Sequence, residues 1–168
     1  AGLIAVSENT RQDAARLLGI DPSRIHVIHS GVSNAFFTTG PEAASRAAAT
    51  YKLTKPYALF IGTVEPRKNL DTLLDARALL SVSCREEVDL VVAGPAGWSS
   101  EKTLARLTAG EGGVRYLGYV PETDLPGLTA GARIFVYPSL YEGFGFPVAE
   151  AMACGVPVVA SGVSSLPE

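Results

Sequence analysis

The stretch Tyr137–Ser161 reads YPSLYEGFGFPVAEAMACGVPVVAS and joins two apolar segments through a glycine-rich turn and a helical segment. Pro147 near the start of the helical segment and Gly155 at its end are typical helix boundary residues. A strand, a helix and a second strand in this order are typical of two parallel strands joined by a crossover helix. The stretch therefore predicts an α/β fold.

The same alternation continues through most of the chain. Short, nearly continuous apolar segments are typical of strands that are buried on both faces. Strands are expected at residues 57–62, 88–94, 114–118, 133–137 and 156–160, with helices at 69–80, 99–110, 122–132 and 147–154. We predict an open parallel sheet flanked by helices.

The first forty residues have a different pattern. A helix is expected at 8–18, ended by Gly19, and a strand at 25–28, before an alanine-rich helix leads into the main sheet. The chain begins without Met and stops just after a strand, so we expect it to be part of a longer polypeptide.

Composition and charge exclude several classes of protein. Hydrophobic residues make up 47% and charged residues 18% of the chain, which excludes a disordered protein. The net charge of −3 argues against a nucleic-acid partner, which requires a basic face. No apolar run approaches the ~20 residues of a membrane span. Cys84 and Cys154 stand in no metal-binding spacing, and we expect two reduced thiols in a cytoplasmic protein.

Ligands of open parallel sheets bind beyond the carboxyl ends of the strands. The loops at this edge are expected at 62–69, 94–100, 118–124, 138–147 and 161–168. In the first of them, Arg67 and Lys68 precede a helix that is expected to begin near Asn69. Two cations beside a helix N-terminus can bind phosphate, although a solvated basic turn has the same pattern.

The loop at 138–147 combines glycines with two carboxylates. Gly143 and Gly145 allow the backbone to approach a ligand, and the helix that follows offers free N–H groups to an anion. Glu142 and Glu150 can accept hydrogen bonds from sugar hydroxyls. Alternatively, Glu142 caps the turn and Glu150 compensates the helix dipole, and the pattern alone leaves both interpretations open.

Several other sites are excluded or disfavoured. The chain has no GxxxxGK[ST] phosphate loop, and Val148 replaces the third glycine of a dinucleotide-binding GxGxxG motif, which disfavours a Rossmann dehydrogenase. No Asp-x-Asp pair follows a strand, and His26 and His29 are expected to be structural or solvent-facing. We therefore predict no metal site and no cofactor.

Residues 142–161, EGFGFPVAEAMACGVPVVAS, strongly resemble the Glu-x7-Glu motif of the retaining glycosyltransferases of group 1 (family 4), which have the GT-B fold. The segments GTVEPRKNLDTLLDA, LVVAGPAGW and VRYLGYVPETDLPGL are similar to the family's other donor-site segments, in the same order. Residues 6–32 resemble the segment that closes the family's first domain. The resemblance implies that residues 41–168 are the nucleotide-sugar (donor) binding domain, truncated at its C-terminus. It also implies that residues 1–40 are the end of the acceptor domain and a linker.

The resemblance also implies roles for individual residues. Arg67 and Lys68 are expected to bind the donor diphosphate, Glu142 to lie near the donor sugar, and Glu150 to bind the ribose. Arg67, Lys68 and Glu142 are the expected catalytic residues. The two cations stabilise the charge that grows on the leaving phosphate without a metal, and Glu142 lies near the donor sugar. Further substrate-binding residues are expected at Gly62, Thr63, Gly94, Tyr119, Val120, Gly143, Phe144, Gly145 and Val148, with Tyr119 and Val120 at the base.

The sequence departs from the family in three places. Thr63 stands where the family often has Arg, so Arg67 is expected to supply the second cation. His29-Ser30-Gly31-Val32-Ser33 stands where the family often has Pro-Asn-Gly-Val-Asp. The family's first domain is almost wholly absent, so we expect this chain to bind donor weakly and not to transfer sugar by itself.

The resemblance thus implies an enzyme that moves a hexose from a nucleotide-diphosphate sugar to a glycan or lipid-linked acceptor. The Glu-Pro-Arg-Lys-Asn form of the basic loop resembles mannosyltransferases of surface polysaccharides, so GDP-mannose is the expected donor. The acceptor is expected to bind the missing N-terminal domain, and peripheral contact of the full-length enzyme with the inner face of the membrane is left open. The alternatives are a GT-B sugar-nucleotide epimerase and a non-catalytic nucleotide-sugar binding module.

Overall fold

The computed structural model describes residues 2–168 and contains a five-stranded parallel sheet of order β5-β4-β3-β6-β7. Its strands are β3 (Tyr57–Ile61), β4 (Asp89–Ala93), β5 (Val114–Gly118), β6 (Ile134–Tyr137) and β7 (Val158–Ala160). Every neighbouring pair is parallel. The predicted α/β fold and its five strands are therefore confirmed.

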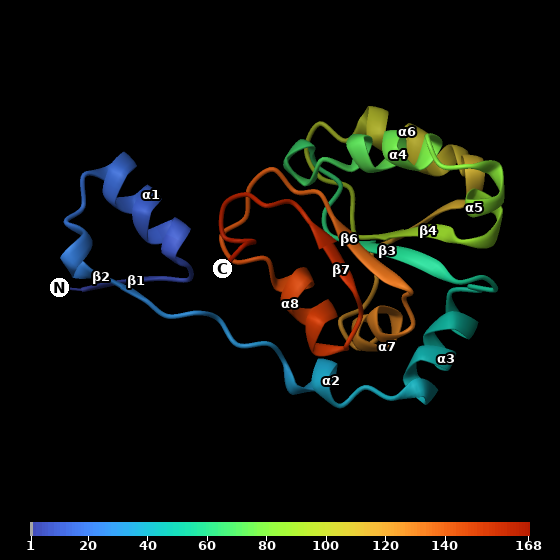
Figure 1. The fold of residues 1–168 in the computed structure, drawn as a ribbon, viewed down its shortest axis with the longest axis horizontal. Helices are drawn as coiled ribbons and strands as arrows, with labels where there is room; N and C mark the ends of the chain where they lie inside the picture. The colour runs from blue at the N-terminus through green and yellow to red at the C-terminus, as the bar shows by residue number, and fades with distance from the viewer. Residues whose placement is uncertain (1) are drawn as a thin grey trace.

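Helices cover both faces of this sheet (Figure 1). On one face lie α4 (Leu70–Ala78), α5 (Val82–Glu87) and α6 (Glu101–Ala109). On the other face lie α3 (Pro41–Thr50), α7 (Leu125–Ala130) and α8 (Phe146–Ala153). None of the described helices is both long and apolar enough to cross a lipid bilayer.

The central strands form the core. All five residues of β4 are buried, as its continuous apolar run predicted. Leu59 and Phe60 of β3 and Phe135 and Tyr137 of β6 are fully buried beside it. The sheet is thus a rigid support for the loops that leave its carboxyl edge.

A smaller unit precedes the main sheet and lies beside it in Figure 1. It contains β1 (Leu3–Ala5) and β2 (Ile25–Val27), paired in parallel, with α1 (Glu8–Leu18) and η1 (Pro22–Arg24) between them. Ser7 caps α1, and Gly19 ends it in the left-handed conformation. The chain then runs to α2 (Asn34–Phe37) and α3. The predicted helix (8–18) and strand (25–28) are present here as α1 and β2, whereas β1 and α2, and α5 beside the main sheet, were not predicted.

Two glycines bring the loops after β3 and β4 together. Gly62 N donates to Ala93 O at 2.9 Å, and Gly94 N donates to Gly118 O at 2.7 Å. A Cβ atom on Gly94 would lie 2.0 Å from Gly62 O, and Gly94 has a φ of 144°. Only glycine fits at Gly94, so this residue allows the two loops to leave the sheet edge side by side.

Candidate functional site

The loop after β3 is joined to the loop after β6 by hydrogen bonds. Leu140 N donates to Arg67 O at 2.9 Å, and Asn69 Nδ2 donates to Pro138 O at 3.2 Å. Arg67 and Lys68 belong to the short turn η2 (Pro66–Lys68), and Asn69 follows in the left-handed conformation before α4 begins at Leu70. Two loops that are distant in sequence are thus held together at the site.

A cavity of about 500 Å³ lies between these loops. Eight of the residues expected at the site line it: Gly62, Thr63, Arg67, Lys68, Glu142, Gly143, Phe144 and Gly145. The sequence did not predict its other lining residues, which are Val6, Glu65, Tyr137, Phe146 and Pro147. The structure therefore brings the two expected cations, the first glutamate and the glycine turn to one place.

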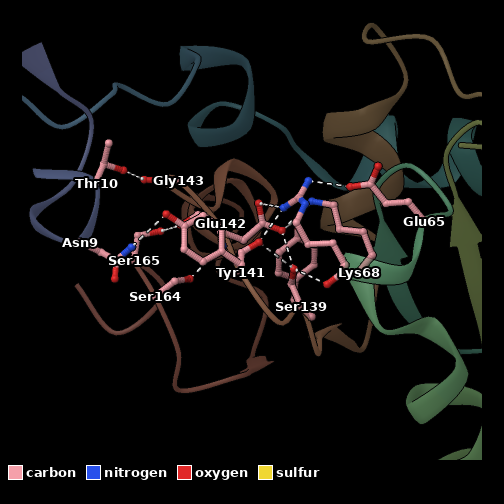
Figure 2. Close-up of polar contacts among 12 residues, drawn as sticks. Asn9, Thr10, Glu65, Lys68, Ser139, Tyr141, Glu142, Gly143, Ser164 and Ser165 are labelled. Atoms are coloured by element: carbon pink, nitrogen blue, oxygen red, sulfur yellow. Dashed lines mark hydrogen bonds and ion pairs between the residues drawn. The ribbon is translucent and has the colours of Figure 1, made fainter. Parts of the chain in front are cut away.

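The cavity contains a network of ion pairs, drawn in Figure 2. Lys68 Nζ lies 2.6 Å from Glu142 Oε1, and Arg67 Nη1 lies 2.9 Å from Glu142 Oε2. Arg67 Nη2 also lies 2.7 Å from an oxygen of Glu65. Two cations are thus matched by two carboxylates, and the sequence did not predict that the cations pair with Glu142.

Glu142 is kept ionised by its neighbours. Burial would raise its pKa, but hydrogen bonds from Lys68 and Ser139 and the charge of Lys68 outweigh burial and hold the pKa below its usual value. Glu142 is 7% exposed, and Lys68 is 8% exposed. An ionised carboxylate accepts hydrogen bonds and cannot donate a proton, so Glu142 is suited to binding hydroxyl or cationic groups.

The glycine turn presents unpaired backbone donors. Gly145 has a φ of 91° and stands at the N-cap of α8, and a Cβ atom there would lie 2.6 Å from the Leu166 side chain. A Cβ atom on Gly143 would lie 3.9 Å from the Val6 side chain, its nearest contact outside the turn. Within residues 2–168, the N–H groups of Gly143, Phe144 and Gly145 have no hydrogen-bond acceptor. Free N–H groups beside a helix N-terminus form a seat for an anion.

The other expected site residues do not line this cavity. Gly94 is buried at the junction with Gly62, Tyr119 is exposed and Val120 is buried. Val148 lines a neighbouring cavity of about 260 Å³, which shares Phe144 and Gly145 with the first.

Glu150 lies one turn into α8 and also outside the cavity lining. It is half-buried, and in the described part of the chain its carboxylate has no hydrogen bond or ion pair. Burial, and then the charge of Glu122, raise the pKa of Glu150. A half-buried carboxylate without a partner can accept hydrogen bonds from a ligand.

The N-terminal unit contacts the glycine turn directly. Tyr141 Oη donates to Asp13 Oδ2 at 2.7 Å, and Thr10 Oγ1 donates to Gly143 O at 3.3 Å. The Glu168 carboxylate accepts hydrogen bonds from Glu8 N and Asn9 N at the start of α1. The turn is therefore held between the basic loop on one side and α1 on the other, as Figure 2 shows for Thr10, Gly143 and Tyr141.

Across residues 2–168 no group of three or more His, Cys, Asp or Glu side chains is arranged to hold a metal ion. The expectation of chemistry without a metal stays a prediction. The chemical groups that the cavity does offer are two cations, two carboxylates and unpaired backbone N–H groups.

Comparison with known proteins gives the family. The model of the family described as "Glycosyl transferases group 1" matches residues 42–168. The O-antigen chain mannosyltransferase B of Escherichia coli is 44% identical over 169 residues, covering 99% of this chain and 44% of that protein. A D-inositol 3-phosphate glycosyltransferase of Mycolicibacterium gilvum is 39% identical, covering 98% of this chain and 38% of that protein. The chain thus spans less than half the length of these relatives.

Solved structures agree on the fold. The Anabaena protein HepE, crystallised with UDP and glucose, superposes with a TM-score of 0.82 at 25% identity, over 98% of this chain and 45% of HepE. The lipopolysaccharide glycosyltransferase WaaG has the same fold, with a TM-score of 0.81 at 20% identity over 98% of this chain and 45% of WaaG. The sheet and its flanking helices are those of a GT-B domain. The chain therefore belongs to the group 1 glycosyltransferases (family 4).

Proposed function

We propose that this chain is the donor-binding part of a retaining hexosyltransferase. Residues 41–168 form the nucleotide-sugar binding domain, and residues 1–40 form the end of the acceptor domain and the linker. The observation that carries the proposal is the cavity in which Arg67 and Lys68 meet the unpaired N–H groups of the glycine turn. A glycan or lipid-linked acceptor binds the remainder of the enzyme.

The donor diphosphate binds between the basic loop and the start of α8. Lys68 and Arg67 supply positive charge, and the N–H groups of Phe144 and Gly145 supply directed hydrogen bonds. The carboxylates of Glu65 and Glu142 already pair with these cations, so the ligand binds cations whose positions are fixed beforehand. Cations that are held in place need little reorganisation when the ligand arrives.

The two glutamates of the motif bind the two sugars. Glu142, kept ionised in the cavity wall, accepts hydrogen bonds from hydroxyls of the donor sugar. Glu150, which has no partner among residues 2–168, accepts them from the ribose. The backbone at Tyr119 and Val120, at the carboxyl end of β5, holds the base.

The reaction breaks the bond between the sugar and the diphosphate, so negative charge grows on the leaving phosphate. Lys68, Arg67 and the N-terminus of α8 stabilise this charge without a metal. One such group is worth about 3 kcal/mol in the transition state, or ~100-fold in rate.

The donor sugar is mannose, carried as GDP-mannose. The 44% identity to an E. coli protein named as a mannosyltransferase supports this choice. The HepE structure contains UDP and glucose, so a UDP-sugar is the competing donor.

The test is calorimetric titration of the chain with GDP, UDP, GDP-mannose and UDP-glucose, without metal. Lys68→Ala and Glu150→Ala should both weaken binding of one nucleotide series. Arg46→Ala is the matched control, because Arg46 is exposed on α3 and does not line the cavity. Equal affinity of Lys68→Ala and the wild type would contradict the proposed site.

A further inference from the structure

Tyr137 is the last residue of β6 and is fully buried at the floor of the cavity. Its ring stacks against Phe60 and Phe135, with centroid distances of 5.6 and 5.9 Å. A tyrosine in this apolar setting contributes packing through its ring, and phenylalanine would pack equally well. Its hydroxyl therefore requires a separate explanation, because a buried hydroxyl costs free energy unless it is hydrogen-bonded.

The Tyr137 hydroxyl lies between the two charged residues at the centre of the site. Lys68 Nζ donates to Tyr137 Oη at 2.6 Å, and Tyr137 Oη donates to Glu142 Oε1 at 3.0 Å. The direction of both bonds is fixed, because an ammonium only donates and an ionised carboxylate only accepts. Burial, and then the charge of Glu142, raise the pKa of Tyr137, so the hydroxyl keeps its proton.

These hydrogen bonds fix the rotational orientation of the Lys68 ammonium group about its Cε–Nζ bond. An ammonium group has three N–H donors. One points to Tyr137 Oη and one to Glu142 Oε1, each at 2.6 Å. With two acceptors fixed by the protein, the direction of the third N–H follows, and it is available to a phosphate oxygen.

The same bonds distinguish the two oxygens of Glu142. Oε1 accepts hydrogen bonds from Lys68, Tyr137 and Ser139, the last at 2.7 Å. A carboxylate oxygen has about two lone pairs, so Oε1 has no capacity left. Within residues 2–168 the polar contact of Oε2 is the ion pair with Arg67, at 2.9 Å. Oε2 is therefore the oxygen that can accept a ligand hydroxyl.

We propose that Tyr137 is a positioning residue of the donor site. Its hydroxyl holds Lys68 and Glu142 in one relative orientation, directing one ammonium N–H to the diphosphate and Glu142 Oε2 to the sugar. The inference rests on the proposed function and adds to the donor site a buried residue of strand β6. Ser139 acts on Glu142 in the same way, from the opening of the loop after β6.

The test compares Tyr137→Phe with Tyr57→Phe. Tyr57 is the matched control because it is also buried, at 3% exposed, and its hydroxyl donates to Leu128 O at 2.7 Å, away from the cavity. Each variant loses one buried hydroxyl, so a merely structural role predicts a similar loss of stability and unchanged donor binding for both. The positioning role predicts that Tyr137→Phe alone weakens donor binding, by about tenfold, which corresponds to one hydrogen bond to a charged group.

A second readout needs no ligand. Titration of the Glu142 carboxyl by ¹³C NMR should give a higher pKa in Tyr137→Phe than in the wild type, because the ionised form loses a hydrogen bond. Tyr57→Phe should titrate as the wild type does. Ser139→Ala should shift the Glu142 pKa in the same direction, and it serves in place of Tyr137→Phe if that variant does not fold.

The outcomes separate the two proposals. If the wild type binds a nucleotide sugar and Tyr137→Phe binds it equally well, with an unchanged Glu142 titration, the positioning role is overturned and the proposed function stands. If the wild type binds no nucleotide sugar, the proposed function itself is overturned, together with the ligand-directed role of Tyr137.

Discussion

Lys68 donates to Glu142 Oε1 at 2.6 Å, although the two residues stand 74 positions apart in the chain. Both side chains are about 10% exposed, so water screens the pair poorly. The contact joins the loop after β3 to the loop after β6, which are the two walls of the cavity. The ion pair therefore stabilises the packing of these two loops, in addition to its part in the proposed donor site.

A double-mutant cycle on this pair should reveal strong coupling. Lys68→Met leaves a buried carboxylate without its closest cation, and we expect a loss of stability on the order of 3 kcal/mol. The double variant Lys68→Met with Glu142→Gln should lose less than the sum of the single variants. Urea unfolding of the four proteins measures the coupling, and additive free energies would show that the two side chains do not stabilise each other.

The coupling should depend on pH in a defined direction. The folded-state pKa of Glu142 is lowered, so the folded chain binds this proton less tightly than the unfolded chain. The stabilisation is then fully present above the ordinary glutamate pKa of about 4.3 and is lost as pH falls through the lower folded-state value. The same cycle repeated at decreasing pH should give a shrinking coupling energy, and coupling that stayed constant into strong acid would contradict the ion pair.

Glu150 should behave in the opposite way. Its pKa is raised, mainly by burial, so the ionised form destabilises the folded chain at neutral pH and the penalty fades as pH falls through the raised pKa. Glu150→Gln should therefore stabilise the chain at neutral pH, by roughly 0.5–2 kcal/mol, while weakening donor binding. Glu101→Gln is the control, since Glu101 is exposed in the first turn of α6. Thermal unfolding across pH measures the effect, and a destabilised Glu150→Gln would refute it.

Gly94, at its junction with Gly62, should tolerate no side chain. Gly94→Ala would place a Cβ atom 2.0 Å from Gly62 O, and relieving this clash should cost at least about 2 kcal/mol. Gly118→Ala is the matched control, because Gly118 has a φ of 65° but open space around a Cβ, so only backbone strain of roughly 1 kcal/mol is expected. Chemical denaturation of both variants measures the difference. Equal losses of stability in the two variants would mean that the close approach of the two loops adds no cost to a side chain at Gly94.

The fold was predictable because its strands leave short, nearly continuous apolar runs in the sequence, even at the edges of the sheet, where β5 and β7 are only partly buried. All of β4 is buried, and the expected strand at 88–94 differs from it by one residue at each end. The short elements β1 and α5 were not predicted, and the mostly polar sequence VSCREE of α5 carries no apolar periodicity. Glu65 and Tyr137 were missed at the site for a different reason. Their roles depend on partners supplied by other loops, and Tyr137 has the pattern of an ordinary strand residue.

The sequence predicted the cations and the glutamate at one site but assigned them separate ligands. In the structure the two cations form ion pairs with Glu142. That relationship depends on how two loops pack across the sheet edge, and no spacing within either loop encodes it. The position of Glu150 outside the cavity lining could not be predicted from the sequence either. Helix periodicity indicates the direction of a side chain but not the shape of the cavity near it.

The most direct test of the donor site is a ¹H–¹⁵N NMR titration of the chain with GDP-mannose and, separately, with UDP-glucose. We expect one of them to shift the amide signals of Gly143, Phe144 and Gly145 together with that of Lys68, and the Lys68→Ala variant to lose those shifts. Amide shifts confined to other parts of the chain, or none with either nucleotide sugar, would contradict the assignment of this cavity to the donor.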